Sequence, residues 1–237
     1  HPKGIDIDSK GNIYIADNFN NVIRKFDSRA KTLTTVAGSG DFGPNSTTVP
    51  ALTASFYLPM GVTVDNNDNV LIVDWHNNQI RKLDTTTWKV ENIAGTSIPG
   101  FSGDNQPAIA AQLNEPRRTT VDNEGNIYIA DTFNNRIRKI SVQSGKITTI
   151  AGNGRRGFNG DGILATEASL NNPMDVDIDK KGNIFIADTA NERIRMIDVK
   201  TGIILTIPSV RLATPTSINI DEQGQLIVTD KIRHIVF

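Results

Sequence analysis

The segment GNIYIADNFNNVIRKFD, residues 11–27, returns as GNIYIADTFNNRIRKIS at residues 125–141. Both segments belong to a longer unit, in which a proline precedes the first apolar run and an aspartate closes the second. The prolines are 57, 57, 57 and 42 residues apart: Pro2, Pro59, Pro116, Pro173 and Pro215. The aspartates repeat with similar offsets: Asp17, Asp74, Asp131, Asp188 and Asp230. A period of this length indicates an architecture built from copies of one supersecondary unit.

Each copy is expected to fold as four strands. In the first copy the β-rich runs GIDID, IYIAD, VIRKF and LTTVAG are separated by SKGN, NFNN and SRAK. Short turns rich in Gly, Asn, Asp and Ser connect neighbouring antiparallel strands. The strands carry apolar residues on both faces, so each sheet needs a neighbour on either side. Radial stacking about one axis supplies these neighbours, which predicts an all-β chain folded as a β-propeller of four-stranded antiparallel blades.

Composition excludes several classes of function. The 237 residues include 25 basic and 26 acidic side chains, a net charge of −1, so no global field draws the protein to nucleic acid or to a membrane. The absence of cysteine excludes disulfides, thiolate metal sites and cysteine nucleophiles. No apolar run reaches the ~20 residues of a membrane-spanning helix, so no membrane insertion is expected. Because the chain begins with His1, we expect a processed product or an excised domain.

The repeated motifs resemble a known family. PMGVTVD from Pro59, GNIYIAD from Gly125 and NNRIRKI from Asn134 are similar to the NHL repeat, and the connectors from Gly100 and Gly157 resemble those of long-connector NHL repeats. The resemblance covers the whole chain and implies one propeller domain over residues 1–237. Its blades are expected at about 1–38, 58–95, 115–152, 172–210 and 214–237.

The number of blades leaves two alternatives. The resemblance implies six blades, whereas five copies are counted in the sequence. Either a further blade lies outside this chain, or the ring has five blades and an unpaired edge. An unpaired edge is a surface through which the protein could self-associate.

Two motifs suggest ligand sites but are interpreted as turns. GSGDFG (38–43) and GNGRRG (152–157) match Gly-x-Gly-x-x-Gly, yet a dinucleotide site needs a parallel sheet and a helix at the third glycine. DIDSKGNIYIAD (6–17) spaces its carboxylates as a calcium loop does, but it lacks flanking helices and continues as a strand.

No catalytic residue is predicted. An arginine recurs with the aspartate of each copy, and we interpret these pairs as fixing blade geometry: Arg24, Arg81, Arg138 and Arg195. The three histidines, His1, His76 and His234, occupy unrelated places in their copies, so no three-histidine zinc site is predicted. No nucleophile elbow occurs. An enzyme is therefore the less favoured hypothesis.

Alternating strands predict two different faces. The second-to-third turns and the connectors should emerge together, on what we call the connector face. This face is predicted to hold the candidate binding residues: Phe19, Trp75, His76, Phe133, Arg117, Arg118, Arg155 and Arg156. Aromatic and arginine side chains are typical of a binding surface. Phe101 and Phe158, which recur 57 residues apart, are instead expected to form small apolar clusters under the connectors.

A polar ring is predicted at the axis. The fourth residue after each marker proline is polar between apolar neighbours: Asp6, Thr63, Thr120, Asp177 and Asn219. We expect these residues to line a central channel. Water is the favoured occupant, and the alternative is a weakly bound calcium ion with Asp6 and Asp177 as candidate ligands. No other cofactor is expected.

These observations favour a non-enzymatic binding module. Its expected partner is a protein or an acidic ligand on the connector face. Nucleic acid ranks below these, because binding would rest on four arginine contacts. One alternative is a hydrolase or lyase with an axial metal, as the resemblance to lactonase-like and amidating-lyase-like propellers suggests. A further alternative is a structural module of an extracellular assembly.

One glycosylation signal bears on the compartment. Asn45 begins the chain's one Asn-x-Thr sequon, in the first connector. We therefore expect a glycosylated Asn45 and a secreted or cell-surface protein, with the cytoplasm as the alternative.

Overall fold

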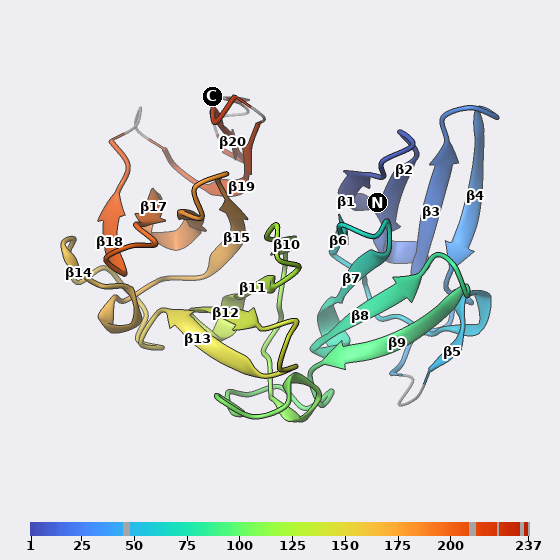
Figure 1. Ribbon diagram of the computed structural model, residues 1–237, viewed down its shortest axis with the longest axis horizontal. Coiled ribbons are helices and arrows are strands. Elements are labelled where there is room, and N and C mark those ends of the chain that lie inside the picture. Colours follow the sequence, from blue (N-terminus) through green and yellow to red (C-terminus); the bar gives the residue numbers. More distant parts are fainter. Residues whose placement is uncertain (45–47, 209–211, 222, 233–234, 237) are drawn as a thin grey trace.

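A computed structural model describes residues 1–44, 48–208, 212–221, 223–232 and 235–236. Its five sheets follow one another around an arc, with the first and last sheets at the two ends (Figure 1). All strand pairs within the sheets are antiparallel, and apart from β5 (Val49–Pro50) and β14 (Ile163–Leu164), strands consecutive in one blade are neighbours. This confirms the predicted all-β propeller of repeated blades.

Among the described residues, four of the blades have at least four strands, and the fifth has three. Blades 1 and 2 contain β1 (Pro2–Ile7), β2 (Ile13–Asp17), β3 (Val22–Asp27) and β4 (Thr32–Ala37), then β6 (Gly61–Val64), β7 (Val70–Asp74), β8 (Gln79–Asp84) and β9 (Lys89–Ala94). Blades 3 and 4 contain β10 (Thr119–Val121), β11 (Ile127–Asp131), β12 (Arg136–Ile140) and β13 (Ile147–Ala151), then β15 (Pro173–Ile178), β16 (Ile184–Asp188), β17 (Arg193–Ile197) and β18 (Ile203–Thr206). Blade 5 contains β19 (Pro215–Ile220), β20 (Leu226–Asp230) and β21 (Ile235–Val236).

Blades 2 and 4 each have a fifth strand, which the four-strand pattern did not predict. β5 (Val49–Pro50) pairs with β9, and β14 (Ile163–Leu164) pairs with β18. In blade 3 the corresponding contact is a single bridge between Pro107 and Lys146. Each connector thus crosses the outer edge of the blade it enters before it turns toward the axis. Two residues are too few to show a strand period in the sequence.

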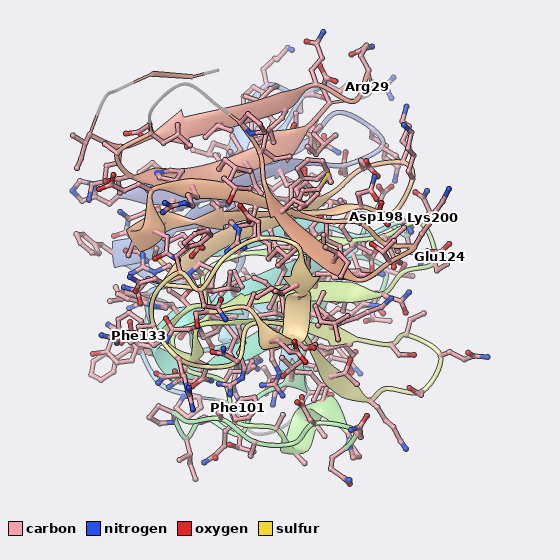
Figure 2. The ribbon with its side chains drawn as sticks, turned by 90° about the vertical axis from the view of Figure 1, so that its left-hand side faces the viewer. Arg29, Phe101, Glu124, Phe133, Asp198 and Lys200 are labelled. Carbon is pink, nitrogen blue, oxygen red and sulfur yellow. The ribbon has the colours of Figure 1, made fainter. Side chains whose placement is uncertain are left out.

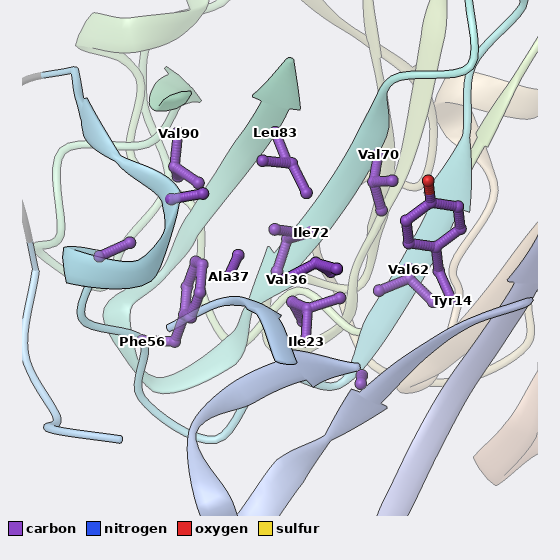
Figure 3. Packing of buried hydrophobic residues seen from close by; sticks show 13 residues of the cluster. Tyr14, Ile23, Val36, Ala37, Phe56, Val62, Val70, Ile72, Leu83 and Val90 are labelled. Atoms are coloured by element: carbon purple, nitrogen blue, oxygen red, sulfur yellow. The ribbon is translucent and has the colours of Figure 1, made fainter. Parts of the chain in front are cut away.

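The connectors also fill the spaces between blades. Each of the three long connectors has one 3₁₀ turn among its described residues: η2 (Ala51–Thr53), η4 (Ala108–Ala110) or η6 (Ala165–Glu167). In the first connector Ala51, Ala54 and Phe56 are buried in one cluster with residues of blades 1 and 2. Figure 3 shows Phe56 beside Ala37 of blade 1, in the same cluster as Ile72 and Leu83 of blade 2. Burial of one aromatic side chain here contributes roughly 3 kcal/mol, so the connectors stabilise the stacking of blades.

The second-to-third turns also join neighbouring blades. They form η1 (Asn18–Asn20), η3 (Trp75–Asn77), η5 (Thr132–Asn134) and η7 (Thr189–Asn191). Asn21, Asn78 and Asn135 follow the first three turns in the left-handed conformation, which asparagine tolerates. Their side-chain oxygens accept backbone N–H bonds from the next connector at 2.9, 2.8 and 3.0 Å.

The two motifs interpreted as turns are turns. An Asp8 carboxylate oxygen accepts the N–H groups of Lys10 and Asn12 at 3.0 and 2.8 Å, which closes the hairpin between β1 and β2. The N–H groups of Gly38 and Gly152 donate to connector carbonyls, each at 2.9 Å. Within the described residues, no helix is long and apolar enough to cross a membrane.

Candidate functional site: the connector face and the axis

The two faces of the propeller differ in composition. Figure 2 shows Arg29, Glu124, Asp198 and Lys200 projecting on one side, from first-to-second and third-to-fourth turns. Phe133 lies on the opposite side and projects from η5, a second-to-third turn. The turns therefore separate as the strand order predicts, and Phe133 lies on the connector face.

A row of stacked rings crosses the connector face at blade 2. The ring of Phe42 lies 5.5 Å from that of Tyr57, and Tyr57 meets His76 edge-on at 5.0 Å. His76 stacks on Trp75 with ring centres 3.9 Å apart. The Arg117 guanidinium lies 5.1 Å from the Trp75 ring centre, within the range of a cation–π contact. The row connects a first-connector residue to a residue at the entrance of β10.

The remaining predicted residues of the connector face have separate surroundings. Phe19, in η1, is exposed and contacts only the ring of His1 among aromatic groups, at 5.0 Å. Phe133 is partly exposed, and its N–H donates to the Asn114 carbonyl. Arg155 and Arg156 are exposed on the connector between blades 3 and 4.

Arg117 and Arg118 line a cavity of about 450 Å³ at the connector-face end of the axis, which we call the mouth. The residue directly after the marker proline contributes from every blade: Lys3, Met60, Arg117, Met174 and Thr216. The other lining residues are Arg118, Thr214, Ser217, Thr229 and Lys231. The described part of the lining includes four cationic side chains and no carboxylate. Arg155 and Arg156 are not part of it, so the four arginines divide into two pairs.

A second cavity, of about 320 Å³, lies along the axis. The structure places the expected ring in its lining: Asp6, Thr63, Thr120, Asp177 and Asn219. Several of these side chains bond to the next blade. An Asp6 oxygen accepts the Val64 N–H at 2.7 Å, and the Thr63 hydroxyl donates to the Thr119 carbonyl at 2.7 Å. The ring therefore connects the innermost strands as well as lining the cavity.

The axial donor set does not match what calcium needs. Both Asp6 oxygens already accept backbone N–H groups, from Ile7 and Val64. The Asp177 oxygens accept the Thr120 hydroxyl and the Ile220 N–H. Burial raises the pKa of both carboxyls, which disfavours their charged forms. Calcium takes six to eight oxygen ligands, whereas the described residues contain no group of three or more His, Cys, Asp or Glu side chains that could hold a metal.

A buried carboxyl near the axis was not predicted. Asp175 accepts the Ser217 hydroxyl at 2.7 Å and the Val176 N–H at 2.8 Å. Burial raises the pKa of Asp175 to about 6, although the positive charge of Arg118 opposes this shift. Asp175 and Arg118 occupy the same position after their marker prolines. That position varies from copy to copy, which was the available signal that it faces the axis.

The repeated arginines form structural pairs, as expected. The arginine–aspartate distances are 3.1 Å for Arg24–Asp17, 3.7 Å for Arg81–Asp74, 3.2 Å for Arg138–Asp131 and 3.5 Å for Arg195–Asp188. In blade 3 the connector adds a second carboxylate, Asp104, at 2.9 Å from Arg138. The last three pairs are buried, so they hold blades and connectors together rather than contact a ligand.

The expectation for Phe101 and Phe158 was wrong. Neither ring forms an apolar cluster, because each lies over two guanidinium groups and stays 40% exposed. The Phe101 ring centre is 3.6 Å from Arg136 and 4.8 Å from Arg138. The corresponding distances for Phe158 are 4.2 Å to Arg193 and 4.9 Å to Arg195. The two rings cover the buried arginines and leave one side open to solvent.

Comparison with known proteins places the repeats in a family. The NHL repeat matches residues 56–83 and 113–140, and the teneurin NHL domain matches residues 154–219. Protein SUPPRESSOR OF QUENCHING 1, chloroplastic, of Arabidopsis thaliana is 34% identical over 63% of this chain and 15% of its own length. Teneurin-1 of Homo sapiens is 30% identical over 83% of this chain and 8% of its own length. The chain therefore spans only a small part of these relatives.

Solved structures agree on the fold. A chain of a nidogen–laminin complex superposes with a TM-score of 0.70 at 14% identity, over 99% of this chain and 74% of that one. Virginiamycin B lyase from Staphylococcus aureus superposes with a TM-score of 0.63 at 17% identity, over 99% of this chain and 65% of that one. At these identities the likeness shows the fold alone. Because the family matches fall on the strands and turns that build the blades, the chain belongs to the NHL-repeat β-propeller family.

Proposed function

We propose that this chain is a non-enzymatic binding module that takes a protein partner on its connector face. The observation that carries the proposal is the exposure of aromatic rings on that face. Phe42 is 73% exposed and Phe19 is 63% exposed, and Tyr57, Phe101, Phe133 and Phe158 are also exposed. Exposed aromatic groups of this kind are unusual on a surface that contacts only water.

The stacked row suits the centre of an interface. Tyr57, His76 and Trp75 hold one another in place, so little side-chain entropy remains to be lost on binding. Trp75 and Arg117 are of the two types most often found as binding hot spots.

The enzymatic alternative has weaker support. The axial cavity offers the carboxyls of Asp6, Asp175 and Asp177 and no histidine. Each of these carboxyls already accepts hydrogen bonds from the protein. Similarity to virginiamycin B lyase is similarity of fold. A nucleic-acid partner is also less favoured, because the four arginines divide between the mouth and a connector rather than forming one track.

A matched set of variants tests the proposal. Phe42→Ser and Phe133→Ser remove rings of the connector face, whereas Val142→Ser and Val199→Ser remove exposed apolar groups from turns of the opposite face. All four should change the stability by less than about 0.5 kcal/mol. In quantitative capture of proteins from the source organism, the two phenylalanine variants should lose a partner that the valine variants retain. Equal retention by all four would contradict the proposal.

The location stays a prediction. The relatives do not agree on one compartment, since one of them is named chloroplastic. Asn45, on which the secreted or cell-surface proposal rests, lies outside the described residues. An intact mass of the protein purified from a native eukaryotic source tests it. A glycan mass on Asn45 supports secretion or surface display, as would suit a module of an extracellular assembly, and the bare polypeptide mass argues against both.

A further inference from the structure

The mouth concentrates positive charge that no salt bridge of the described residues neutralises. Four cationic residues line it: Lys3, Arg117, Arg118 and Lys231. Asp6 and Asp175 of the axial cavity offset part of the Arg118 charge, and Glu115 offsets part of the Arg117 charge. The chain as a whole carries a net charge of −1, so the positive charge that remains at the mouth is local, and it attracts an anion.

Arg118 separates the mouth from the axial cavity. It lines both cavities, and its guanidinium reaches across from blade 3 to donate to the Lys3 carbonyl of blade 1 at 3.4 Å. A Cβ atom at Gly4 would lie 2.9 Å from the Arg118 Nη1, so the glycine leaves space for this crossing. One of its five N–H groups has a described acceptor, at a long distance. The remaining donors are available to a ligand in the mouth.

The Trp75 ring positions the Arg117 guanidinium, but one N–H group of this side chain lacks a hydrogen-bond acceptor in the part of the chain that the structure describes. The Trp75 ring supports its guanidinium at 5.1 Å, and its Nε is buried without a hydrogen-bond partner among the described residues. Burial lowers the pKa of Arg117, and the negative charge of Glu115 opposes this shift. A buried N–H group without an acceptor is unfavourable. Because Arg117 lines the mouth, a carboxylate bound there would supply the opposite charge.

The rest of the lining defines the size and chemistry of the ligand. Met60 and Met174 are flexible apolar side chains that adapt to small organic groups. Thr214, Thr216 and Thr229 supply hydroxyls. The volume of about 450 Å³ lies within the usual range for small-molecule sites. The lining therefore combines anion recognition with a short apolar surface.

We propose that the mouth is a binding site for a small organic anion that carries at least one carboxylate, held by Arg117 and Arg118 and assisted by Lys3 and Lys231. Arginine forks match the planar geometry of a carboxylate. The same chemistry could come from a free metabolite or from an acidic side chain of a protein partner. The inference shares the connector face with the proposed function but does not need it, because a small anion can bind when no protein does.

Calorimetric titration with sodium succinate tests the proposal, at an ionic strength matched with sodium chloride. The wild-type chain should release or absorb heat of binding, and Arg118→Met should bind about tenfold more weakly or not at all. Lys3→Met and Lys231→Met change exposed residues and keep the test informative if Arg118→Met fails to fold. Arg155→Met and Lys10→Met remove exposed cations elsewhere and should bind succinate as the wild type does.

Three results would overturn the proposal. They are the absence of heat up to about 10 mM succinate, equal affinity in the mouth variants and the controls, and tighter binding of inorganic phosphate than of succinate. A short acidic peptide in a parallel titration distinguishes the two sources of the carboxylate. If it competes with succinate and the mouth variants abolish both, the site takes carboxylates from either source. If the wild-type chain does not bind succinate but still captures a protein partner, this inference is overturned and the proposed function stands.

Discussion

Blade 1 and the interior blades have the same apolar positions but differ in burial. Leu33 of β4 is 59% exposed, whereas Val90, which stands 57 residues later in β9, is 0% exposed. The same contrast holds between Ile5 of β1 and Val62 of β6. Blade 2 is covered by blade 1 and by a connector, while the corresponding face of blade 1 lies at an end of the arc (Figure 1). Burial here depends on the neighbouring blade and not on the local sequence.

The polar groups show the same difference. The Arg24–Asp17 pair of blade 1 is partly exposed, and the Arg138–Asp131 pair of blade 3 is fully buried. The blade 3 arginine gains Asp104 and the Ser102 carbonyl from its connector. An interior blade therefore makes the same pair part of a buried network. Four predictions test how much the neighbour contributes.

The largest change in the free energy of unfolding is expected when a buried carboxylate is removed. Asp131→Ala should lower the free energy of unfolding by about 3–5 kcal/mol, because it leaves Arg138 without one buried partner. It also leaves the Asn114 backbone N–H and one N–H of the Asn134 side-chain amide without an acceptor. Asp17→Ala should lower it by about 1 kcal/mol or less, since its pair reaches solvent. Urea unfolding of both variants checks this. Equal losses would mean that the interior position adds nothing.

The second effect comes from packing. Ile72→Ala in β7 should lower the free energy of unfolding by about 2–5 kcal/mol, because the side chain is fully buried between blades. Ile15→Ala changes the matching residue of blade 1, which is partly exposed, and should lower it by about 1 kcal/mol. Thermal and urea unfolding measure both variants. The comparison fails if Ile15→Ala is as damaging as Ile72→Ala.

The pH dependence of stability should have opposite signs for the aspartate of an interior blade and for that of blade 1. Burial raises the folded-state pKa of Asp74 from 3.8 to about 7, so this group favours folding most below its unfolded pKa, and stability falls as the pH rises toward 7. One group contributes at most about 1.4 kcal/mol per pH unit. The pKa of Asp17 is lowered through hydrogen bonds from Asn20 and Arg24, although burial opposes this, so its contribution is lost as the pH falls.

The measurement is the melting temperature of the wild-type protein, Asp74→Asn and Asp17→Asn as a function of pH. Asp74→Asn should flatten the decline between about pH 4 and pH 7. Asp17→Asn should leave that decline in place and flatten the loss at lower pH. A wild-type protein whose stability rises throughout this interval, unchanged by Asp74→Asn, would contradict the raised pKa.

The sequence pattern predicts the structural features that lie within a single copy of the repeat. Strands, turn residues and the arginine–aspartate pairs follow from local spacing, because a strand period of two and a fixed repeat leave few alternatives. Arg138 and Asp131 are on adjacent strands and come together in any antiparallel hairpin of this register. The position of the polar ring follows likewise from the shared place of Asp6 and Thr63 after their prolines.

Contacts between copies are less predictable. Arg117 meets Trp75 across 42 positions of sequence, and Arg118 reaches Lys3 across 115. Neither contact has a periodic signal, because each of the two arginines occurs in only one copy. The division of the four arginines into two pairs was missed for the same reason. The exposure of Leu33 could not be inferred either, since its local pattern is that of a buried residue.

The smallest expected effect concerns the exposed face of blade 1. Leu33, Ile5 and Ile7 present an apolar surface whose counterparts in blade 2 pack against another sheet. An exposed apolar surface of this kind promotes association with another chain, and lysine placed within it opposes that association. We expect the wild-type protein to self-associate weakly with rising concentration. The double variant Ile5→Lys and Leu33→Lys should stay monomeric, with a free energy of unfolding changed by less than about 0.5 kcal/mol per site. Sedimentation velocity over a range of concentrations measures this, with Val142→Lys as a control on an exposed turn of another blade. Two results would contradict this prediction: Val142→Lys abolishes self-association as fully as the double variant does, or the wild-type protein stays monomeric at every concentration. Either would show that the exposed face of blade 1 does not mediate self-association in solution.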